Sequence, residues 1–119
     1  MNKQVEKYIV AAMPLLKLEK SLNKELKGYI SSLGPSMRMS GVLPAIAFYC
    51  AKEERNKVMQ WIFEILKGDN VFDEMKGKDN MLDLALELTK EADKKKLEKY
   101  IEDASIALKL CLRTFTLIN

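Results

Sequence analysis

The chain has 119 residues, which is enough for one hydrophobic core and too short for two. Apolar residues make up 48% and charged residues 31%, the balance of a globular protein rather than of a disordered tail. The net charge is only +3, so a histone-like or polybasic coat is excluded. Histidine is absent, which removes the commonest general base near neutral pH and the commonest metal ligand. The composition therefore argues against an enzyme, and we predict no catalytic residue, no metal site and no cofactor.

The sequence also bears on compartment and membrane. Cys50 and Cys111 lie far apart, so neither a disulfide framework nor a Cys-x-x-Cys zinc site is available, and we interpret both as buried small hydrophobes. The apolar stretch 8–16 is interrupted by Pro14 and lacks a small-residue cleavage site, unlike a signal peptide. The longest apolar run, residues 42–51, is shorter than the roughly 20 residues of a membrane-spanning helix. We therefore expect a cytoplasmic protein with reduced thiols and no membrane contact.

Apolar residues recur at spacings of three and four along the chain, which predicts helices rather than strands. The first 33 residues should form one or two helices, with Pro14 marking a start or a kink. A later stripe begins at Val58 and stops at Gly68, a usual C-terminal end for a helix. Residues 68–80 form the clearest loop of the chain. We expect three of its side chains, Val71, Phe72 and Met75, to attach this loop to the core.

Two more helices are predicted after this loop. The first starts near Met81, with Asp79 or Asn80 before it, and its apolar phase fails across residues 90–96. The second is the clearest helix of the chain, with one apolar face over residues 97–115 and Asp93 as a plausible N-cap. We therefore predict an all-α protein, a single compact bundle of about five or six helices over residues 1–119.

The middle of the chain is unusual because residues 26–52 contain no acidic residue. Within it, residues 42–51 are apolar on every side of a helix, which predicts a central helix with neighbours on several faces. Two placements fit: a helix that begins at Ser40 as N-cap, or a longer one from Pro35 that is kinked near Pro44. We prefer the second.

The chain contains no nucleotide-binding, zinc-protease, calcium-binding or hydrolase motif. Asp79, Asp83 and Glu87 follow one helix face and in principle can hold a divalent metal. A solvated helix face is the commoner meaning of such a row, so we assign it no metal.

Charge is placed unevenly along the chain. Residues 1–60 carry 10 basic and 5 acidic side chains, and residues 61–119 carry 10 and 12. The basic residues around the acid-free segment are Arg38, Lys52, Arg55 and Lys57. No acid lies near Arg38 in the sequence to neutralise it. These basic residues either contact a negatively charged partner or simply form a solvated surface without a binding role.

At this segment the sequence PSMRMSGVLPAIAFYCAK, residues 35–52, resembles a known family. It is similar to the signature of the small all-helical subunit of the Cmr-type (type III-B) CRISPR RNA-guided effector complex. In that family an apolar pre-helix with a proline leads to Gly-Leu, a short spacer, Ala-Leu-Ala-Phe and a lysine. Gly41 and Val42 stand for the Gly-Leu, residues 45–48 for the apolar tetrad, and Lys52 for the lysine, without gaps.

The side chains of this signature suggest a packing role. Small residues at Gly41, Ala45 and Ala47 permit close approach of helices, and we expect Phe48 to fill the core. The sequence departs from the family pattern at Pro44 in the spacer and in lacking a tryptophan in its final turns.

The resemblance implies a noncatalytic subunit that stacks in several copies along the inner filament of the complex. Its implied partners are the backbone subunits that hold the guide RNA, other copies of itself, and the guide–target RNA duplex through weak phosphate contacts. A subunit along such a duplex needs cations that face phosphates. The candidate cations are Arg38, Lys52, Arg55, Lys57, Lys109 and Arg113, because Lys52 and Arg55, and likewise Lys109 and Arg113, share a face at helical spacing.

Three alternatives remain open at this point. The chain can be the equivalent subunit of the sister Csm-type (type III-A) complex, or a generic helical protein-interaction adaptor without a nucleic acid. A metal-dependent nuclease that uses Asp79, Asp83 and Glu87 is the least favoured.

Overall fold

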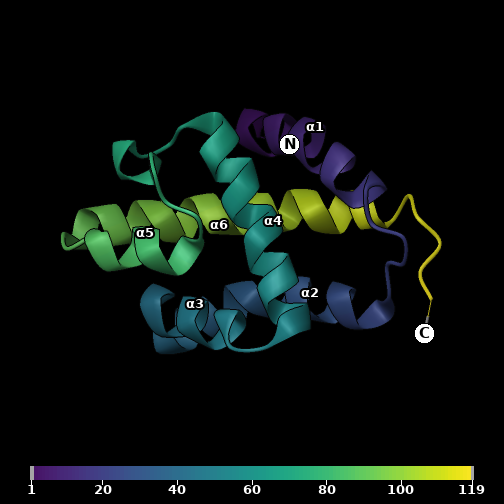
Figure 1. Cartoon of the computed structure of the whole chain (residues 1–119), viewed down its shortest axis with the longest axis horizontal. Coiled ribbons are helices and arrows are strands. Elements are labelled where there is room, and N and C mark those ends of the chain that lie inside the picture. The colour runs from purple at the N-terminus through teal and green to yellow at the C-terminus, as the bar shows by residue number, and fades with distance from the viewer. Residues whose placement is uncertain (1, 119) are drawn as a thin grey trace.

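A computed structural model describes residues 2–118 as a bundle of six α-helices with one short 3₁₀ turn (Figure 1). The helices are α1 (Lys3–Lys17), α2 (Lys24–Ser40), α3 (Val42–Cys50), α4 (Glu53–Asp69), α5 (Met81–Glu87) and α6 (Glu91–Leu112), and the 3₁₀ turn η1 covers Asp73–Met75. Within residues 2–118 the only β-type pairing is an isolated bridge between Asn23 and Ile118. The prediction of an all-α bundle is confirmed.

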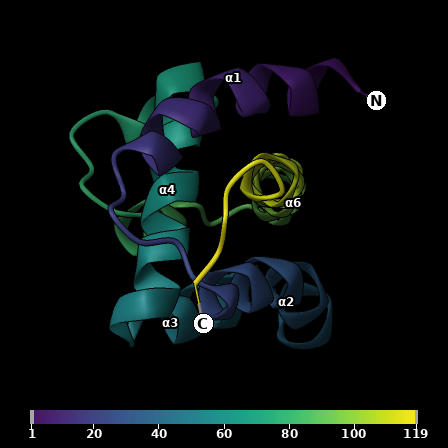
Figure 2. The ribbon, with the colours of Figure 1, turned by 90° about the vertical axis from the view of Figure 1, so that its right-hand side faces the viewer.

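The longest helix, α6, is the axis around which the others pack. Figure 1 shows α6 along the long dimension of the molecule, with α4 crossing it. In Figure 2, which looks along α6, α1 lies on one side of it and α2 with α3 on the opposite side. α6 contacts all four of these helices. An amphipathic helix of this length therefore supplies the surface on which the bundle assembles.

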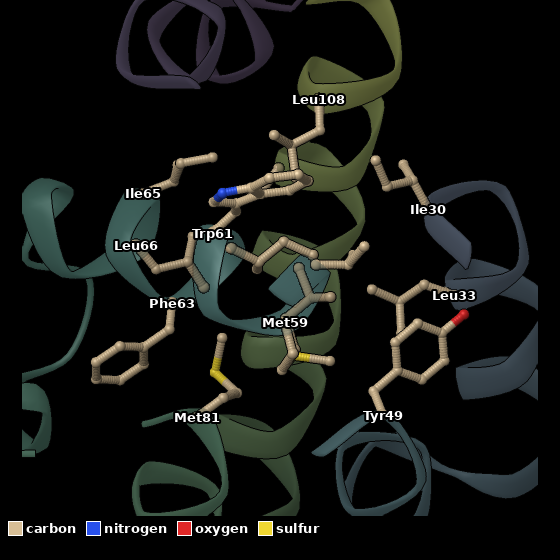
Figure 3. Close-up of a cluster of buried hydrophobic side chains, with 14 of the residues drawn as sticks. Ile30, Leu33, Tyr49, Met59, Trp61, Phe63, Ile65, Leu66, Met81 and Leu108 are labelled. Atoms are coloured by element: carbon tan, nitrogen blue, oxygen red, sulfur yellow. The ribbon is translucent and has the colours of Figure 1, made fainter. Parts of the chain in front are cut away.

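The core is built on the crossing of α4 and α6. Figure 3 shows apolar side chains from α2, α3, α4, α5 and α6 converging in this region. The buried side chains of α4 are Val58, Met59, Trp61, Ile62, Phe63, Ile65 and Leu66. They occupy both sides of the helix, because α4 lies between α1, α2, α3 and α6.

The apolar segment after Gly41 forms α3, which has several helices as neighbours, as predicted, but leaves one side of the helix open to solvent. α3 contacts α2, α4, α5 and α6, but those contacts cover only part of its circumference. Ala45 and Ile46 are buried, whereas Ala47 and Phe48 are exposed. Figure 1 shows α3 beside α2, away from the axis of α6. An entirely apolar sequence hides which face is covered, because the helical pattern carries no polar side to mark the solvent.

The preferred placement of a kinked helix from Pro35 is wrong. Pro35 lies inside α2, which runs on to Ser40, and Gly41 separates α2 from α3. The alternative that starts a helix after Ser40 is closer, although Gly41 and not Ser40 is the N-cap. Pro44 falls in the first turn of α3, where a missing backbone N–H costs little.

The start of α5 was predicted correctly, whereas Asn2 and Asn23, whose side chains cap α1 and α2, were not predicted as caps. Asn80 caps α5 by accepting a hydrogen bond from the backbone N of Asp83 (2.9 Å). A break separates α5 from α6 as predicted, but it lies at residues 88–90, and residues 91–96 already belong to α6. α4 continues past Gly68 to Asp69, and its C-cap, Asn70, adopts a left-handed conformation (φ 53°). Asp93 is not the N-cap of α6, because that helix already begins at Glu91.

The chain after α6 returns to the loop between α1 and α2. The backbone N of Ile118 donates to the carbonyl of Leu22 (2.9 Å), and the N of Lys24 donates to the carbonyl of Ile118 (3.1 Å). These bonds tie the last described residues to the first helical hairpin. Across residues 2–118 no helix combines the length and apolarity needed to cross a bilayer.

Candidate nucleic-acid interface

The six candidate cations form two groups on the bundle, one where the ends of α2 and α6 lie and one at the start of α4. Arg38 is in the last turn of α2 and Lys109 in the last turn of α6, with Arg113 capping that helix. The remaining three, Lys52, Arg55 and Lys57, are at the start of α4. The side chains of the two groups have different partners.

Arg55 is held by the end of α3. Its Nε donates to the backbone carbonyl of Phe48 (3.1 Å), and its guanidinium carbon lies 3.9 Å from the centroid of the Phe48 ring. The same carbonyl also accepts from the backbone N of Ala51 (3.3 Å), so the bond from Arg55 attaches its side chain to the last turn of α3. Phe48 therefore does not fill the core, as we predicted, but stacks against Arg55 with 56% of its surface exposed. We conclude that the main role of Arg55 is structural, because its side chain joins the start of α4 to the end of α3.

The other two cations of this group differ in how free they are. Lys57 Nζ forms an ion pair with Glu19 (3.1 Å), and the hydrogen bond to Glu19 raises the pKa of Lys57. Glu19 lies in the α1–α2 loop, and its carboxylate neutralises the charge of Lys57. Lys57 is therefore a poor candidate for a phosphate contact. Lys52 is exposed and takes part in no ion pair among residues 2–118. It precedes α4 with extended backbone (φ −131°, ψ 146°), so the helical spacing assumed for Lys52 and Arg55 does not apply.

Arg38 and Lys109 come from distant parts of the sequence and meet at one hollow. This depression of about 160 Å³ lies between α2 and α6, and both cations line it. Glu102 of α6 also lines it, with its Oε2 3.8 Å from Nη1 of Arg38. The expectation that no acid neutralises Arg38 is therefore corrected, since α6 brings one that the local sequence does not show.

Arg113 extends the basic surface past the end of α6. It is exposed and adopts helical backbone angles (φ −62°, ψ −18°) as the C-cap, one turn beyond Lys109. A cation in this place is favourable, because the helix dipole presents negative charge at its C-terminus. The predicted pairing of Lys109 and Arg113 along one face is geometrically reasonable on this backbone.

The family signature is only partly a packing motif. Ala45 is buried as predicted, but Ala47 is exposed. Gly41 is exposed as well, and a β-carbon there would lie 3.6 Å from Cδ of Pro44, an ordinary contact. Gly41 is instead required by its backbone (φ 94°, ψ 161°), which side chains disfavour. The signature therefore encodes the junction between α2 and α3 more than a close helix contact.

The acidic row on α5 does not converge on a common point. Asp79 precedes the helix, Asp83 lies in its first turn, and Glu87 forms an ion pair with Lys78 (2.6 Å). In the described part of the chain, no group of three metal-ligating side chains lies close enough together to hold an ion. The row is therefore best described as a solvated face.

Sequence reasoning missed the hollow and its acid. The signal on α6 was present, because Glu102, Ser105, Ile106 and Lys109 recur at spacings of three and four. No local pattern indicates that this face meets the end of α2, and that meeting defines the hollow.

Comparisons with known proteins add one finding. The model of a family described as CRISPR-associated protein (Cas_Cmr5) matches residues 1–111. Neither curated proteins nor solved structures gave a significant match.

Proposed function

The chain belongs to the Cas_Cmr5 family of CRISPR-associated proteins, the small subunits of Cmr-type (type III-B) systems, and from this premise we propose that it is a noncatalytic filament subunit. It stacks in copies along the inner filament of the effector complex, against the backbone subunits, and stabilises the pairing of guide and target RNA in antiviral defence. The observation that carries the proposal is the family match over residues 1–111. It favours the type III-B assembly over the type III-A equivalent and over an adaptor without nucleic acid.

The distribution of cations supports a weak, backbone-directed contact with RNA. Lys52 and Arg113 are exposed, and Arg38 and Lys109 share a hollow, whereas Lys57 is already paired. A single copy thus offers only a few cations to phosphates. Contacts that are weak in one subunit add up when several copies lie along one duplex. The net charge of +3 fits this arrangement, in which affinity comes from repetition.

The proposal is tested first by assembly. The tagged protein purified from its host should bring down the backbone subunits together with guide RNA. Ribonuclease treatment should reduce the recovered RNA. Recovery of a protein partner in strict 1:1 ratio, unaffected by ribonuclease and free of guide RNA, would show that the chain is an adaptor instead.

The contact with RNA is tested in the assembled complex. A double Lys52→Glu, Lys109→Glu variant should capture target RNA less well than wild type, by a similar factor for every target sequence, because phosphate contacts carry no sequence information. Lys76→Glu, an exposed position after η1, is the matched control and should capture target normally. For the isolated chain, log affinity for single-stranded RNA should fall with log salt with a slope of about 0.7 per phosphate neutralised.

The absence of catalysis is tested separately. The purified chain should leave RNA and DNA intact with Mg²⁺ or Mn²⁺, because the acids of α5 do not form a ligand cluster. Metal-dependent cleavage that disappears in Asp83→Ala would contradict the noncatalytic role.

A further inference from the structure

The hollow between α2 and α6 has the chemical make-up of a phosphate site. A guanidinium from Arg38, an ammonium from Lys109 and hydroxyls from Ser31 and Ser105 line it. The Ser105 hydroxyl donates to the carbonyl of Glu102 (2.8 Å), while the Ser31 hydroxyl makes no hydrogen bond to protein within residues 2–118. Arginine, lysine and serine are among the side chains that most often bind phosphate oxygens.

Gly34 gives the guanidinium its place in the hollow. The Arg38 side chain folds back over this buried glycine, so that a β-carbon at Gly34 would lie 3.4 Å from Nη1 and 3.6 Å from Nη2. Nη1 and Nη2 of Arg38 therefore lie close to the backbone of α2 at Gly34. The Arg38 side chain is still 58% exposed, which leaves it accessible to a ligand.

The pair between Arg38 and Glu102 is loose. The 3.8 Å between Nη1 and Oε2 is longer than a hydrogen bond, and the Glu102 side chain is itself 37% exposed. A solvent-exposed pair of this kind contributes little to stability, so the guanidinium can exchange its carboxylate for another anion. Glu102 is the only acidic residue among those that line the hollow, against two cations.

A second, larger hollow makes a useful contrast. It measures about 360 Å³ and lies between the α2–α3 junction and the start of α6. Two lysines, Lys94 and Lys95, line it together with two carboxylates, Glu91 and Glu98, so its ionic side chains balance. Of these two hollows, the one at Arg38 has an excess of positive charge.

We infer that the hollow between α2 and α6 binds a backbone phosphate of RNA, and that Glu102 acts as an internal competitor for Arg38 that lowers the affinity. The inference rests on the proposed function and names the surface through which the subunit meets RNA. In the free protein the Glu102 carboxylate lies 3.8 Å from the Arg38 guanidinium, where it competes with an incoming anion. When a phosphate enters, Arg38 and Lys109 turn to it, and Glu102 remains as a nearby negative charge. Restrained affinity in each copy suits a subunit whose binding is repeated along a filament.

The test measures binding of fluorescein-labelled oligouridine to the full chain by anisotropy at low salt. Glu102→Gln should bind about threefold more tightly, the effect of removing one charge at about 6 Å in water. Arg38→Gln and Lys109→Gln should each bind more weakly, with a salt slope reduced by up to about 0.7. Glu98→Gln lies one turn away on α6 and changes the net charge by the same amount, so it is the matched control and should change affinity less.

A double variant separates the proposed mechanism from a general charge effect. If Glu102 acts through Arg38, the gain from Glu102→Gln should shrink in the Arg38→Gln background. Thermal unfolding of each variant checks that the fold is unchanged. Equal gains for Glu102→Gln and Glu98→Gln, or an unchanged gain in the Arg38→Gln background, would overturn the inference.

The remaining outcomes distinguish this inference from the proposed function. If wild type binds oligouridine but Arg38→Gln and Lys109→Gln bind equally well, the hollow is not the phosphate site, while the RNA-binding subunit stands. Should the isolated chain bind too weakly to measure, target capture by the assembled complex is compared for the same variants, and no change there also refutes the inference. If polyglutamate competes as oligouridine does and responds to the variants in the same way, the hollow selects acidic partners in general and not RNA. Failure to recover guide RNA with the wild-type protein would instead reject the proposed function.

Discussion

Gly41 adopts a backbone conformation that requires glycine. Its N–H donates to the carbonyl of Met37 (2.8 Å) as α2 ends, and its carbonyl accepts from the N of Ala45 (3.2 Å) as α3 begins. Both bonds require the conformation at φ 94° and ψ 161°, a region that residues with a β-carbon rarely adopt. One residue therefore ends one helix and starts the next.

We expect Gly41→Ala to lower the free energy of unfolding by about 1–3 kcal/mol, the usual cost of such a strained backbone. Gly28→Ala is the control, because a β-carbon there meets nothing within 4 Å and the residue lies inside α2. This variant should raise stability by about 0.5–1 kcal/mol. Urea denaturation measures both. Equal effects of the two substitutions would show that the backbone at Gly41 is not special.

Asp69 is a second residue whose chemistry can be tested, at the contact between the end of α4 and α1. Its Oδ2 accepts hydrogen bonds from Nε2 of Gln4 (2.9 Å) and from the hydroxyl of Tyr8 (3.0 Å), and its other oxygen pairs with Lys7. Burial by itself raises the pKa of Asp69, but the hydrogen bonds from Lys7, Tyr8 and Gln4 outweigh burial and lower the pKa below its usual 3.8. Burial also raises the pKa of Tyr8 well above its usual 10.0, so the phenol stays protonated and can donate.

Asp69→Asn should lower the free energy of unfolding at neutral pH by about 1–3 kcal/mol, the range for hydrogen bonds to a charged group. A carboxyl whose pKa is depressed by folding stabilises above its unfolded pKa of 3.8, and this contribution is lost as pH falls through the lower folded pKa. The difference between wild type and Asp69→Asn should therefore shrink below pH 3.8. Thermal unfolding across acidic pH measures it, with the exposed Asp73→Asn as control. A difference that stays constant with pH would mean that the charge of Asp69 does not matter.

At the scale of the element, α3 is a helix whose sequence conceals its orientation. Ile46 is fully buried (0% exposed), whereas Phe48, two residues on, is 56% exposed and lies under Arg55. The contribution of an apolar side chain to folding stability depends on how much of its surface is removed from water. Ile46 should therefore contribute more than Phe48, although both are apolar.

Ile46→Ala should therefore cost about 2–5 kcal/mol of stability, the range for a buried aliphatic side chain that leaves a cavity. Phe48→Ala should cost about 1 kcal/mol or less, mainly through the lost contact with the guanidinium of Arg55. Chemical denaturation of the two variants compares them within one helix. If Phe48→Ala were as damaging as Ile46→Ala, the face of α3 turned to solvent would be the opposite one.

At the scale of the whole molecule, four helices pack on α6. The hydrogen bonds of Ile118 to Leu22 and Lys24 also join the far end of the chain to its first hairpin. Domain boundaries are places that few contacts cross. Because contacts join all parts of this bundle, we expect no part of it to unfold as a separate domain.

We therefore expect one cooperative unfolding transition. Far-UV circular dichroism reports all helices, while the fluorescence of Trp61, the single tryptophan and 7% exposed, reports the centre of the core. The two unfolding curves should superimpose. A fluorescence change that precedes the loss of helix would instead divide the chain into two units.

The sequence by itself determined the all-α class and the family. The apolar spacing on α6, the Asn80 cap and the apolar phase that fails across residues 90–96 are local signals, because residues three and four apart share a face whatever the rest of the chain does. The signature around Gly41 is local in the same way, since it encodes the conformation of one junction.

Only the tertiary structure decided which cations are free. Arg55 lies on Phe48, Lys57 pairs with Glu19, and Glu102 stands beside Arg38. The partners of Lys57 and Arg38 are far away in the sequence and arrive through the packing of α2 on α6 and of α4 near the α1–α2 loop. The side of α3 that faces solvent was decided in the same way, because a helix that is apolar all round is oriented by its neighbours alone.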